Sequence, residues 1–461
     1  MSGTTAGFRE LSLDPRTRVL DRGRVVLGGD PPRVLRLSEA GAIALRRVLA
    51  GEPAPAALAS RLIAAGLAHP RPVAVPVAGV TIVIPVRDRA DALGRCLAAV
   101  GRQSRVVVVD DASADPAAVA AVCAEHGAEL RRRAVSGGPA AARNDGVAAV
   151  DTELIAFLDS DCVPAPGWLE LLCGAIEDPG VAAAAPRICP IVDPERRSAT
   201  VRYGASRSPL DLGPHPANVR PGGRAGYVPS AALLVRASAL GAGFDPALRY
   251  GEDVDLIWRI CDAGWRVRYE PAAIVRHDEP ERLTALLARR YRYGTSAGPL
   301  ARRHGDRLSP LVIHRRSAVA LLTLIAGRPT VAGAVAGINL ALTARTLGRH
   351  RVPAPVGLAI GATNLLDRTV AAGRATTMLT PGLLALGLSR RRTRLGAAAL
   401  VLADPVRHWI RTRPPLDPVR WTALAIADDI AYGAGVLTGA AQSRTLAPVL
   451  PTLLPRAHGR L

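Results

Sequence analysis

The sequence predicts an α/β protein with a doubly wound, mostly parallel sheet at its centre, a small domain before it and a helical region after it. Two observations carry this prediction. Between residues 77 and 285, apolar runs of strand length alternate with helical stretches. Beyond residue 285 the composition shifts to alanine, leucine and glycine punctuated by arginine. We therefore expect three domains, at residues 1–76, 77–285 and 286–461.

The first segment is expected to contain strands and two short helices. A strand-like run at 24–27 precedes a Gly-Gly-Asp-Pro-Pro turn. Ser38 fits the N-cap of a helix that continues to Leu49, and a second helix is expected over 55–65. The segment ends in a linker marked by Pro70, Pro72 and Pro76.

The central segment supplies the predicted sheet. Strands are expected at 80–86, 106–109 and 154–158, with helices at 90–100 and 117–126. In such sheets, ligands bind in the crevice outside the carboxyl ends of the strands. Polar residues at these ends are therefore candidates for a functional site.

Four polar clusters occupy the predicted strand ends. They are Ile84-Pro85-Val86-Arg87-Asp88, Val109-Asp110-Asp111-Ala112-Ser113, Leu158-Asp159-Ser160-Asp161, and Gly251-Glu252-Asp253 with His277 further on. The pattern suits sugar transfer from a nucleotide diphosphate, because a divalent ion neutralises the charge that grows on the departing diphosphate. Mg²⁺ and Mn²⁺ favour carboxylate oxygens together with substrate phosphates, and the two acids of the Asp-x-Asp run can turn toward one ion. A further carboxylate has to deprotonate the attacking hydroxyl, and the Glu-Asp pair is the candidate.

Each cluster also has a purely structural interpretation. The Asp-x-Asp run, taken alone, is an ordinary loop after an apolar strand. Asp110 and Asp111 can cap a helix near Ser113. Glu252 or Asp253 can be a helix N-terminal acid favoured by the helix dipole. The order and spacing of all four clusters within one α/β segment favour the functional interpretation.

Residues 80–285 resemble an inverting family 2 glycosyltransferase with the GT-A fold. The resemblance is carried by the clusters above, by Gly137-Gly138-Pro-Ala-Ala-Ala-Arg143-Asn144-Asp-Gly146, and by the stretch from Gly251 through Gly264 to Tyr269-Glu-Pro271. It implies a GT-A core, Rossmann-like and mostly parallel. The Gln-x-x-Arg-Trp motif of processive polysaccharide synthases is missing from the sequence, and residues 289–294 occupy that region instead. This departure puts membrane-translocating synthesis in doubt.

The resemblance implies a role for each matching residue. A nucleotide-sugar site would comprise Pro85, Arg87, Asp110, Asp111, Arg143, Asn144 and Asp159. Within it, Asp111 would hold the uracil of a UDP-sugar and Arg143 would lie near the diphosphate. A Mn²⁺ or Mg²⁺ ion would be held by Asp159, Asp161 and His277. Asp253, with Glu252 beside it, would be the catalytic base, and inversion would follow from direct attack by one activated hydroxyl.

The flanking segments extend the resemblance. The run at 34–41, the helix that follows it, Leu49-Ala-Gly51 and the run at 58–67 are together similar to the small winged-helix-like, peptide-recognising domains of modified-peptide biosynthesis. The whole arrangement resembles the glycosyltransferases of the mycofactocin system. That implies transfer of glucose from UDP-glucose to a peptide-derived small molecule, a redox cofactor or its precursor, and growth of a β-linked oligosaccharide. A transferase with a lipid-linked or cell-envelope acceptor, and a peptide-binding scaffold with an inactive transferase fold, stay open as alternatives.

The last segment accounts for almost all of the net charge of +20. Residues 286–461 contain 25 arginines, six aspartates and no glutamate. Arginines beside apolar runs favour association with anionic lipid on the cytoplasmic face of the cell membrane. The longest such run, 317–344, is interrupted by Arg328, and a soluble helical domain with exposed arginines stays open as the alternative.

Composition excludes several other classes. Apolar residues make up 49% of the chain, which excludes a disordered protein. Aromatic residues make up 3%, and no recognition motif is present, so no nucleic-acid partner is expected. Six cysteines without a Cys-x-x-Cys pair predict reduced thiols, not a disulfide scaffold or zinc finger. Residues 1–14 contain no long apolar run, so we expect no signal peptide.

Overall fold

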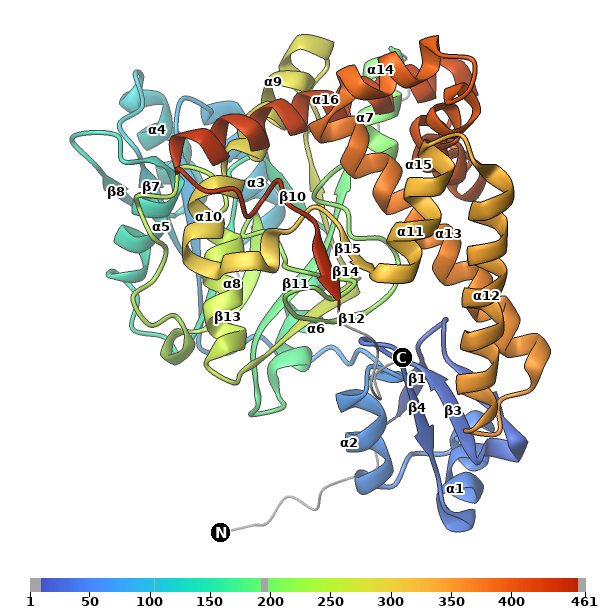
Figure 1. Cartoon of the computed structure of the whole chain (residues 1–461). Coiled ribbons are helices and arrows are strands. Elements are labelled where there is room, and N and C mark those ends of the chain that lie inside the picture. Colours follow the sequence, from blue (N-terminus) through green and yellow to red (C-terminus); the bar gives the residue numbers. More distant parts are fainter. Residues whose placement is uncertain (1–9, 103, 192–197, 455–461) are drawn as a thin grey trace.

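The computed structural model describes residues 10–102, 104–191 and 198–454. In Figure 1, the sheet and the helices that cover it lie to the left of the view. A group of long helices lies to their right, and the N-terminal elements lie below these long helices. The α/β core, the small N-terminal sheets and the helical C-terminal region agree with the predicted fold class.

The core is a nine-stranded mixed sheet. Its order is β10 (Cys162–Pro164), β14 (Arg266–His277), β11 (Val181–Pro190), β13 (Ala232–Arg236), β9 (Leu154–Leu158), β6 (Val80–Val86), β7 (Arg105–Asp110) and β8 (Glu129–Arg132), with β12 (Ala217–Val219) paired to β14. Strands β9, β6, β7 and β8 are parallel neighbours, whereas β13 runs antiparallel to both of its neighbours. The strands predicted at 80–86 and 154–158 have these bounds, and β7 is one residue longer at each end than predicted.

Helices cover both faces of this sheet. They are α3 (Ala90–Val100), α4 (Pro116–His126), α5 (Gly138–Val147), α6 (Trp168–Ile176), α7 (Ala199–Ser206) and α8 (Glu252–Asp262). Leu93 and Leu172 pack into the core on one face, and Phe157 and Leu256 into the core on the other. The strands are buried on both faces, which explains their continuous valine and isoleucine runs.

The N-terminal elements form two small sheets and two helices. Strands β2 (Arg18–Leu20), β3 (Val25–Gly28) and β4 (Arg33–Arg36) make an antiparallel sheet, and β1 (Leu11–Leu13) pairs with β5 (Ala68–Pro70). A 3₁₀ turn, η1 (Asp21–Gly23), joins β2 to β3. Helices α1 (Glu39–Leu49) and α2 (Ala56–Ala64) confirm the two predicted helices, and Ser38 caps α1 by accepting the Gly41 N–H at 3.2 Å. The proline linker lies against α6, where the Val75 N–H donates to the Glu170 carbonyl at 3.1 Å.

The C-terminal region is helical, with one short pair of strands. Its helices are α9 (Leu283–Thr295), α10 (Ala297–His304), α11 (Arg315–Ile325), α12 (Pro329–Gly348), α13 (Ala354–Leu379), α14 (Pro381–Ser389), α15 (Arg394–Thr412) and α16 (Pro418–Gln442). Strands β15 (Val312–His314) and β16 (Thr452–Leu454) pair in parallel. The predicted boundary at residue 285 falls inside α9, and the apolar run at 317–344 breaks at Gly327 and Arg328 into α11 and α12. Within the described ranges, α12 is the one helix long and apolar enough to cross a membrane.

Glycines allow α16 to pack very closely against α9 and α10. A Cβ added at Gly435 would collide with the Tyr291 carbonyl of α9, and one added at Gly439 would collide with that of Thr295. In Figure 1, α16 crosses above the sheet beside α9. The last long helix of the chain is therefore packed tightly against the two helices that directly follow the α/β core.

The six cysteines, Cys96, Cys123, Cys162, Cys173, Cys189 and Cys261, are all free thiols. This agrees with the prediction from their spacing.

Candidate active site

The carboxyl ends of β6, β7 and β9 meet at one edge of the sheet. Because these strands are parallel neighbours, the loops that follow them adjoin one another. The Asp111 N–H, just after β7, donates to the Val86 carbonyl of β6 at 2.9 Å. Arg87, just after β6, donates from Nη1 to Ser136 Oγ at 2.9 Å. The first three predicted clusters are thus brought together by strand order.

Asp111 holds the glycine loop in front of α5. Its carboxylate accepts the Gly137 and Gly138 N–H groups, both at 2.8 Å, and Ser136 Oγ at 2.7 Å. Arg133 adds an ion pair at 3.0 Å. Gly138 has a φ of +82°, a conformation that disfavours side chains, so the Gly-Gly pair has a structural reason. Asp111 therefore lines the site and fixes the shape of its loop.

Arg143 joins two of the predicted acids. It lies on α5 with only 3% of its side chain exposed, and it donates from Nη1 to Glu252 Oε1 at 2.9 Å and from Nη2 to Asp159 Oδ1 at 2.7 Å. Burial alone would lower the pKa of Arg143, but the two carboxylates raise it above its ordinary value. Phe244 packs beneath the guanidinium, 5.3 Å from ring centre to Cζ. Arg143 thus links the end of β9 to the start of α8.

Asp253 occupies the first turn of α8 beside this pair. Its Oδ1 accepts the Val254 N–H at 2.8 Å, and its Oδ2 lies 3.4 Å from the Ser230 nitrogen that donates to it. Burial and the neighbouring charge of Glu252 raise the pKa of Asp253 to about 7. A carboxylate with this pKa can accept a proton near neutral pH.

Asp161 and His277 face each other because of strand pairing. In the antiparallel β10–β14 ladder, Cys162 lies opposite His277, which brings the preceding Asp161 to the same point. His277 Nε2 lies 3.6 Å from Asp161 Oδ2, and Arg89, which sequence reasoning missed, pairs with the same carboxylate. Asp159 turns to Arg143 instead. Among the residues that the structure describes, no group of three or more His, Cys, Asp and Glu side chains is arranged to hold a metal.

These residues line one large cavity of about 1370 Å³. The predicted site residues in its wall are Pro85, Arg87, Asp111, Arg143, Asp159, Asp161, Glu252, Asp253 and His277. Asp110 and Asn144 are not in the wall. Asp110 is fully buried and accepts the Ser113 N–H at 2.9 Å in the turn before α4, but it does not cap that helix, whose N-cap is Asp115. Asn144 bonds both backbone groups of Phe244 at 2.7 and 2.9 Å.

The opposite wall comes from the C-terminal helices, which sequence reasoning did not place in the site. Five of its charged residues form ion pairs with one another or with Arg207, which follows α7 in the core segment; they are Arg290, Arg374, Asp404, Asp428 and Asp429. Asp428 pairs with Arg290 at 2.6 Å and accepts the Tyr203 hydroxyl at 2.7 Å. One signal was available in the sequence, because Asp428 and Asp429 are the charged residues in the otherwise uncharged stretch 421–443, and buried charges need partners.

A loop over residues 220–227 forms part of the cavity wall and is held by the N-terminal elements. Gly222, Gly223 and Tyr227 line the cavity. Asp30, after β3, accepts the Arg224 N–H at 2.6 Å and pairs with Arg220. The N-terminal domain therefore contacts the loop that shapes the site.

Comparisons with known proteins show the family to which the chain belongs. The family model described as Glycosyl transferase family 2 matches residues 81–239. The chain is 40% identical over 470 aligned residues to the pre-mycofactocin glycosyltransferase of Mycobacterium tuberculosis, covering 96% of this chain and 97% of that protein. It is also 32% identical over 203 residues to the succinoglycan biosynthesis protein ExoU of Rhizobium meliloti, covering 41% and 58% of the two chains.

Among solved structures, a mannosyltransferase from Pyrobaculum calidifontis, determined with GDP-mannose and Mn²⁺, matches with a TM-score of 0.42 and 21% identity. The match covers 78% of this chain and 89% of the mannosyltransferase chain. The chain belongs to glycosyltransferase family 2, in the family of the pre-mycofactocin glycosyltransferases.

Proposed function

We propose that this enzyme transfers a hexose, glucose in our proposal, from a UDP-sugar to a hydroxyl of pre-mycofactocin, with inversion at the anomeric carbon. The acceptor is taken from the name of the 40% identical relative that the chain matches over 96% of its length. The observation that carries the chemistry is the single cavity in which Asp253 and Asp161 share a wall. Repeated transfer would build a β-linked oligosaccharide.

In the proposed reaction, Asp253 takes the proton of the acceptor hydroxyl. The freed oxygen attacks the anomeric carbon, a new carbon–oxygen bond forms, and the bond to the diphosphate breaks with its electron pair leaving on UDP. A base with its pKa near 7 suits this step because it is ionised in useful amounts while still binding a proton well. Arg143 keeps Glu252 and Asp159 in position, and its charge offsets the negative charge around the base.

The residues present fit a Mn²⁺ or Mg²⁺ ion with two protein ligands. Asp161 and His277 face each other, with His277 Nε2 3.6 Å from Asp161 Oδ2. Such ions usually bind through one or two carboxylates plus substrate phosphates, so three protein ligands are not required. The ion would stabilise the charge that develops on the leaving diphosphate. Arg89 would give up its pairing with Asp161.

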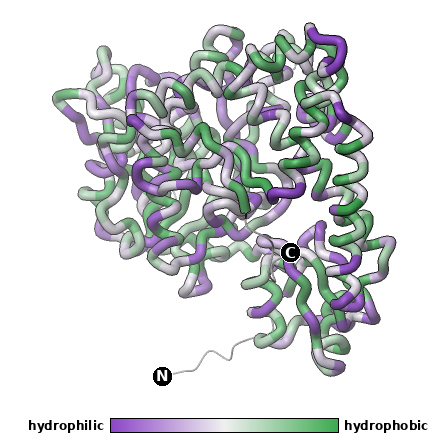
Figure 2. Tube along the Cα trace, viewed as in Figure 1, coloured by the Kyte–Doolittle hydropathy of each residue, from purple (hydrophilic) through white to green (hydrophobic). Residues whose placement is uncertain are grey.

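The flanking regions have proposed roles as well. In our proposal, residues 1–76 form a small winged-helix-like domain that recognises a peptide or a peptide-derived molecule. The helical region is proposed to rest on the cytoplasmic face of the membrane. Its large exposed apolar side chains include Leu322, Ile338 and Leu383, and arginines lie between these residues. In the apolar stretch of α12, only 6% of the residues are buried. Figure 2 shows hydrophobic stretches along the helices at the right-hand edge of the view, where α12 lies.

The test is a transfer assay with purified protein, UDP-glucose, Mn²⁺ and pre-mycofactocin. We expect UDP release that depends on the acceptor, and a product heavier by one or more hexoses in mass spectrometry. UDP release at the same rate without acceptor would contradict the proposal. For the membrane role, sedimentation with anionic vesicles should exceed that with neutral ones.

A further inference from the structure

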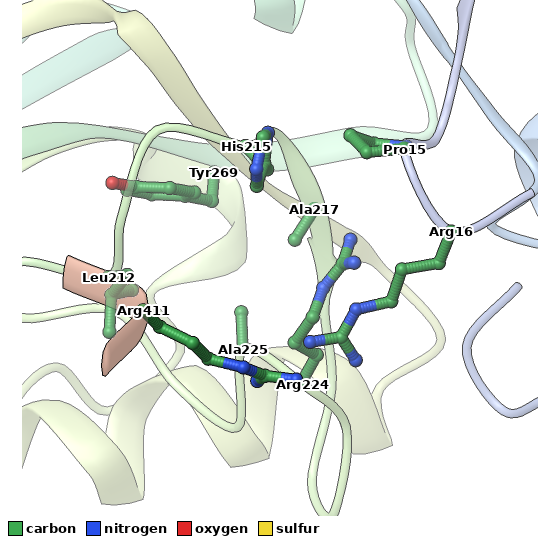
Figure 3. A pocket seen from close by; sticks show the side chains of 9 residues that line it. All are labelled: Pro15, Arg16, Leu212, His215, Ala217, Arg224, Ala225, Tyr269 and Arg411. Atoms are coloured by element: carbon green, nitrogen blue, oxygen red, sulfur yellow. The ribbon is translucent and has the colours of Figure 1, made fainter. Parts of the chain in front are cut away.

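A second cavity, of about 400 Å³, lies where the three parts of the chain meet. The N-terminal segment contributes Pro15 and Arg16, the end of α15 contributes Arg411, and the core contributes Leu212, His215, Ala217, Arg224, Ala225 and Tyr269. Figure 3 shows the side chains of Arg16, Arg224 and Arg411 extending toward one another on one side of this space, with His215 and Tyr269 across from them.

The charges around this cavity are incompletely balanced. Arg224 pairs with the buried Asp14, which also meets His69 at 3.2 Å. Across residues 10–102, 104–191 and 198–454, neither Arg16 nor Arg411 forms a salt bridge. Guanidinium groups around one cavity repel each other, and an anion between them removes that cost. The planar fork of arginine matches the oxygens of carboxylates and phosphates.

Apart from the three arginines and His215, the lining is apolar. Leu212, Ala217 and Ala225 offer only carbon, and the Tyr269 hydroxyl already donates to the Gly213 carbonyl at 2.7 Å, so its ring is what faces the cavity. The volume is several times what one oxyanion fills. We propose that this cavity binds a small organic anion, a carboxylate or phosphate monoester carried on an apolar body.

Such a ligand would act on the active site through the loop at 220–227. Arg224 lines the second cavity, whereas Gly223 and Tyr227 of the same loop line the large one. An anion bound by Arg16 and Arg411 would also bridge the N-terminal segment and α15. The loop at 220–227 contributes Arg224 to the same cavity. Occupancy is therefore expected to stabilise the assembled protein and to alter the loop that borders the active site.

The experiment is calorimetric titration of the full chain with phenyl phosphate, benzoate and inorganic phosphate at constant ionic strength. We expect one site per chain, with an organic anion binding more tightly than inorganic phosphate. Stronger binding of phenyl phosphate would identify a phosphate monoester as the ligand class, and stronger binding of benzoate a carboxylate. Arg16→Gln with Arg411→Gln should weaken binding at least about tenfold, because each removes a charged hydrogen-bond donor.

The controls separate this cavity from the active site. Arg18→Gln with Arg391→Gln removes the same net charge away from the cavity and should leave binding unchanged. Arg87→Gln alters the large cavity and should also leave it unchanged. The proposal is overturned if no organic anion binds at millimolar concentration, if Arg87→Gln abolishes binding, or if the Arg16/Arg411 double variant, shown folded by circular dichroism, binds as well as the wild type. None of these readouts depends on sugar transfer.

Discussion

Arg143 Nη1 and Glu252 Oε1 lie 2.9 Å apart although the two residues are separated by 109 positions in the chain. The contact connects the glycine-rich helix α5 to the first turn of α8, and the same guanidinium reaches Asp159 at 2.7 Å. Because Glu252 is paired in this way, Asp253 next to it is the free acid of the Glu-Asp pair. The contact thus separates the roles of two neighbouring carboxylates.

Replacing Asp253 with Asn should remove the catalytic base. We expect a loss of about 10²- to 10⁴-fold in the transfer rate, the usual range for a general base. The matched control is Asp151→Asn, an acid with 90% of its side chain exposed, which should transfer at the wild-type rate. Transfer by Asp253→Asn within a few-fold of wild type would assign the base elsewhere.

The raised pKa of Asp253 also predicts how rate and stability depend on pH. The base is active when ionised, so the rate should rise with pH through about 7. Ionisation of this buried acid disfavours folding, because its pKa in the folded state lies above the unfolded value of 3.8. Asp253→Asn should therefore be more stable than wild type at pH 8, and the difference should shrink at pH 5. Urea unfolding at the two pH values measures this.

Glu252→Gln should move the acidic limb of the pH–rate profile. The charge of Glu252 helps to raise the pKa of Asp253, so its removal should shift that limb toward lower pH. The variant should also unfold more easily, since breaking a buried ion pair costs about 3–5 kcal/mol. If the acidic limb of the pH–rate profile did not move while stability fell, the ionisation seen in that profile would not be that of Asp253.

Substitutions at Asp161 and Arg89 should change Mn²⁺ binding in opposite directions. Asp161→Asn removes a proposed ligand, and we expect affinity in the presence of UDP to fall at least about tenfold. Arg89→Gln releases Asp161 from an ion pair and should leave affinity equal or higher. Electron paramagnetic resonance of free Mn²⁺ gives both values. If Arg89→Gln weakened binding as much as Asp161→Asn, Arg89 would have a direct role in holding the nucleotide.

Gly435→Ala should destabilise the protein, because its added methyl group meets the Tyr291 carbonyl of α9. Overpacking of this kind costs about 1–3 kcal/mol. Gly333→Ala in α12 is the control, since nothing lies within 4 Å of its added Cβ. It should gain about 0.5–1 kcal/mol from helix propensity. Thermal unfolding followed by circular dichroism would compare the two.

Sequence reasoning predicted the core elements and nine of the residues that line the large cavity for an identifiable reason. Continuous apolar runs fix where the strands lie, and parallel strands necessarily bring their carboxyl ends to one edge. Spacing along the chain did not reveal which way each side chain leaves that edge. Asp110 and Asp111 are adjacent, yet one turns into the protein to cap a turn while the other borders the cavity. In the same way, Arg143 borders the cavity, whereas the adjacent Asn144 turns away from it to bond the backbone of Phe244.

The far wall was beyond reach because it depends on helix packing between distant segments. Nothing local to Asp428 predicts its contact with Tyr203, 225 positions away. That contact forms only when α16 packs closely against α9, with the glycines of α16 against the carbonyls of α9. Such packing depends on the shapes of both helices and not on either sequence alone. Composition predicts solvent- or lipid-facing arginines in the last segment, whereas Arg290 and Arg374 pair with the buried Asp428 and Asp429.

The position of α16 near the end of the chain sets the order in which this enzyme can become functional on the ribosome. The α/β core and its proposed base are synthesised well before residues 418–442, the last element of the cavity wall. A nascent chain that already contains Asp253 still lacks the partners of Arg290 and Tyr203. Premature termination anywhere before α16 would thus leave a core whose cavity lacks this part of its wall.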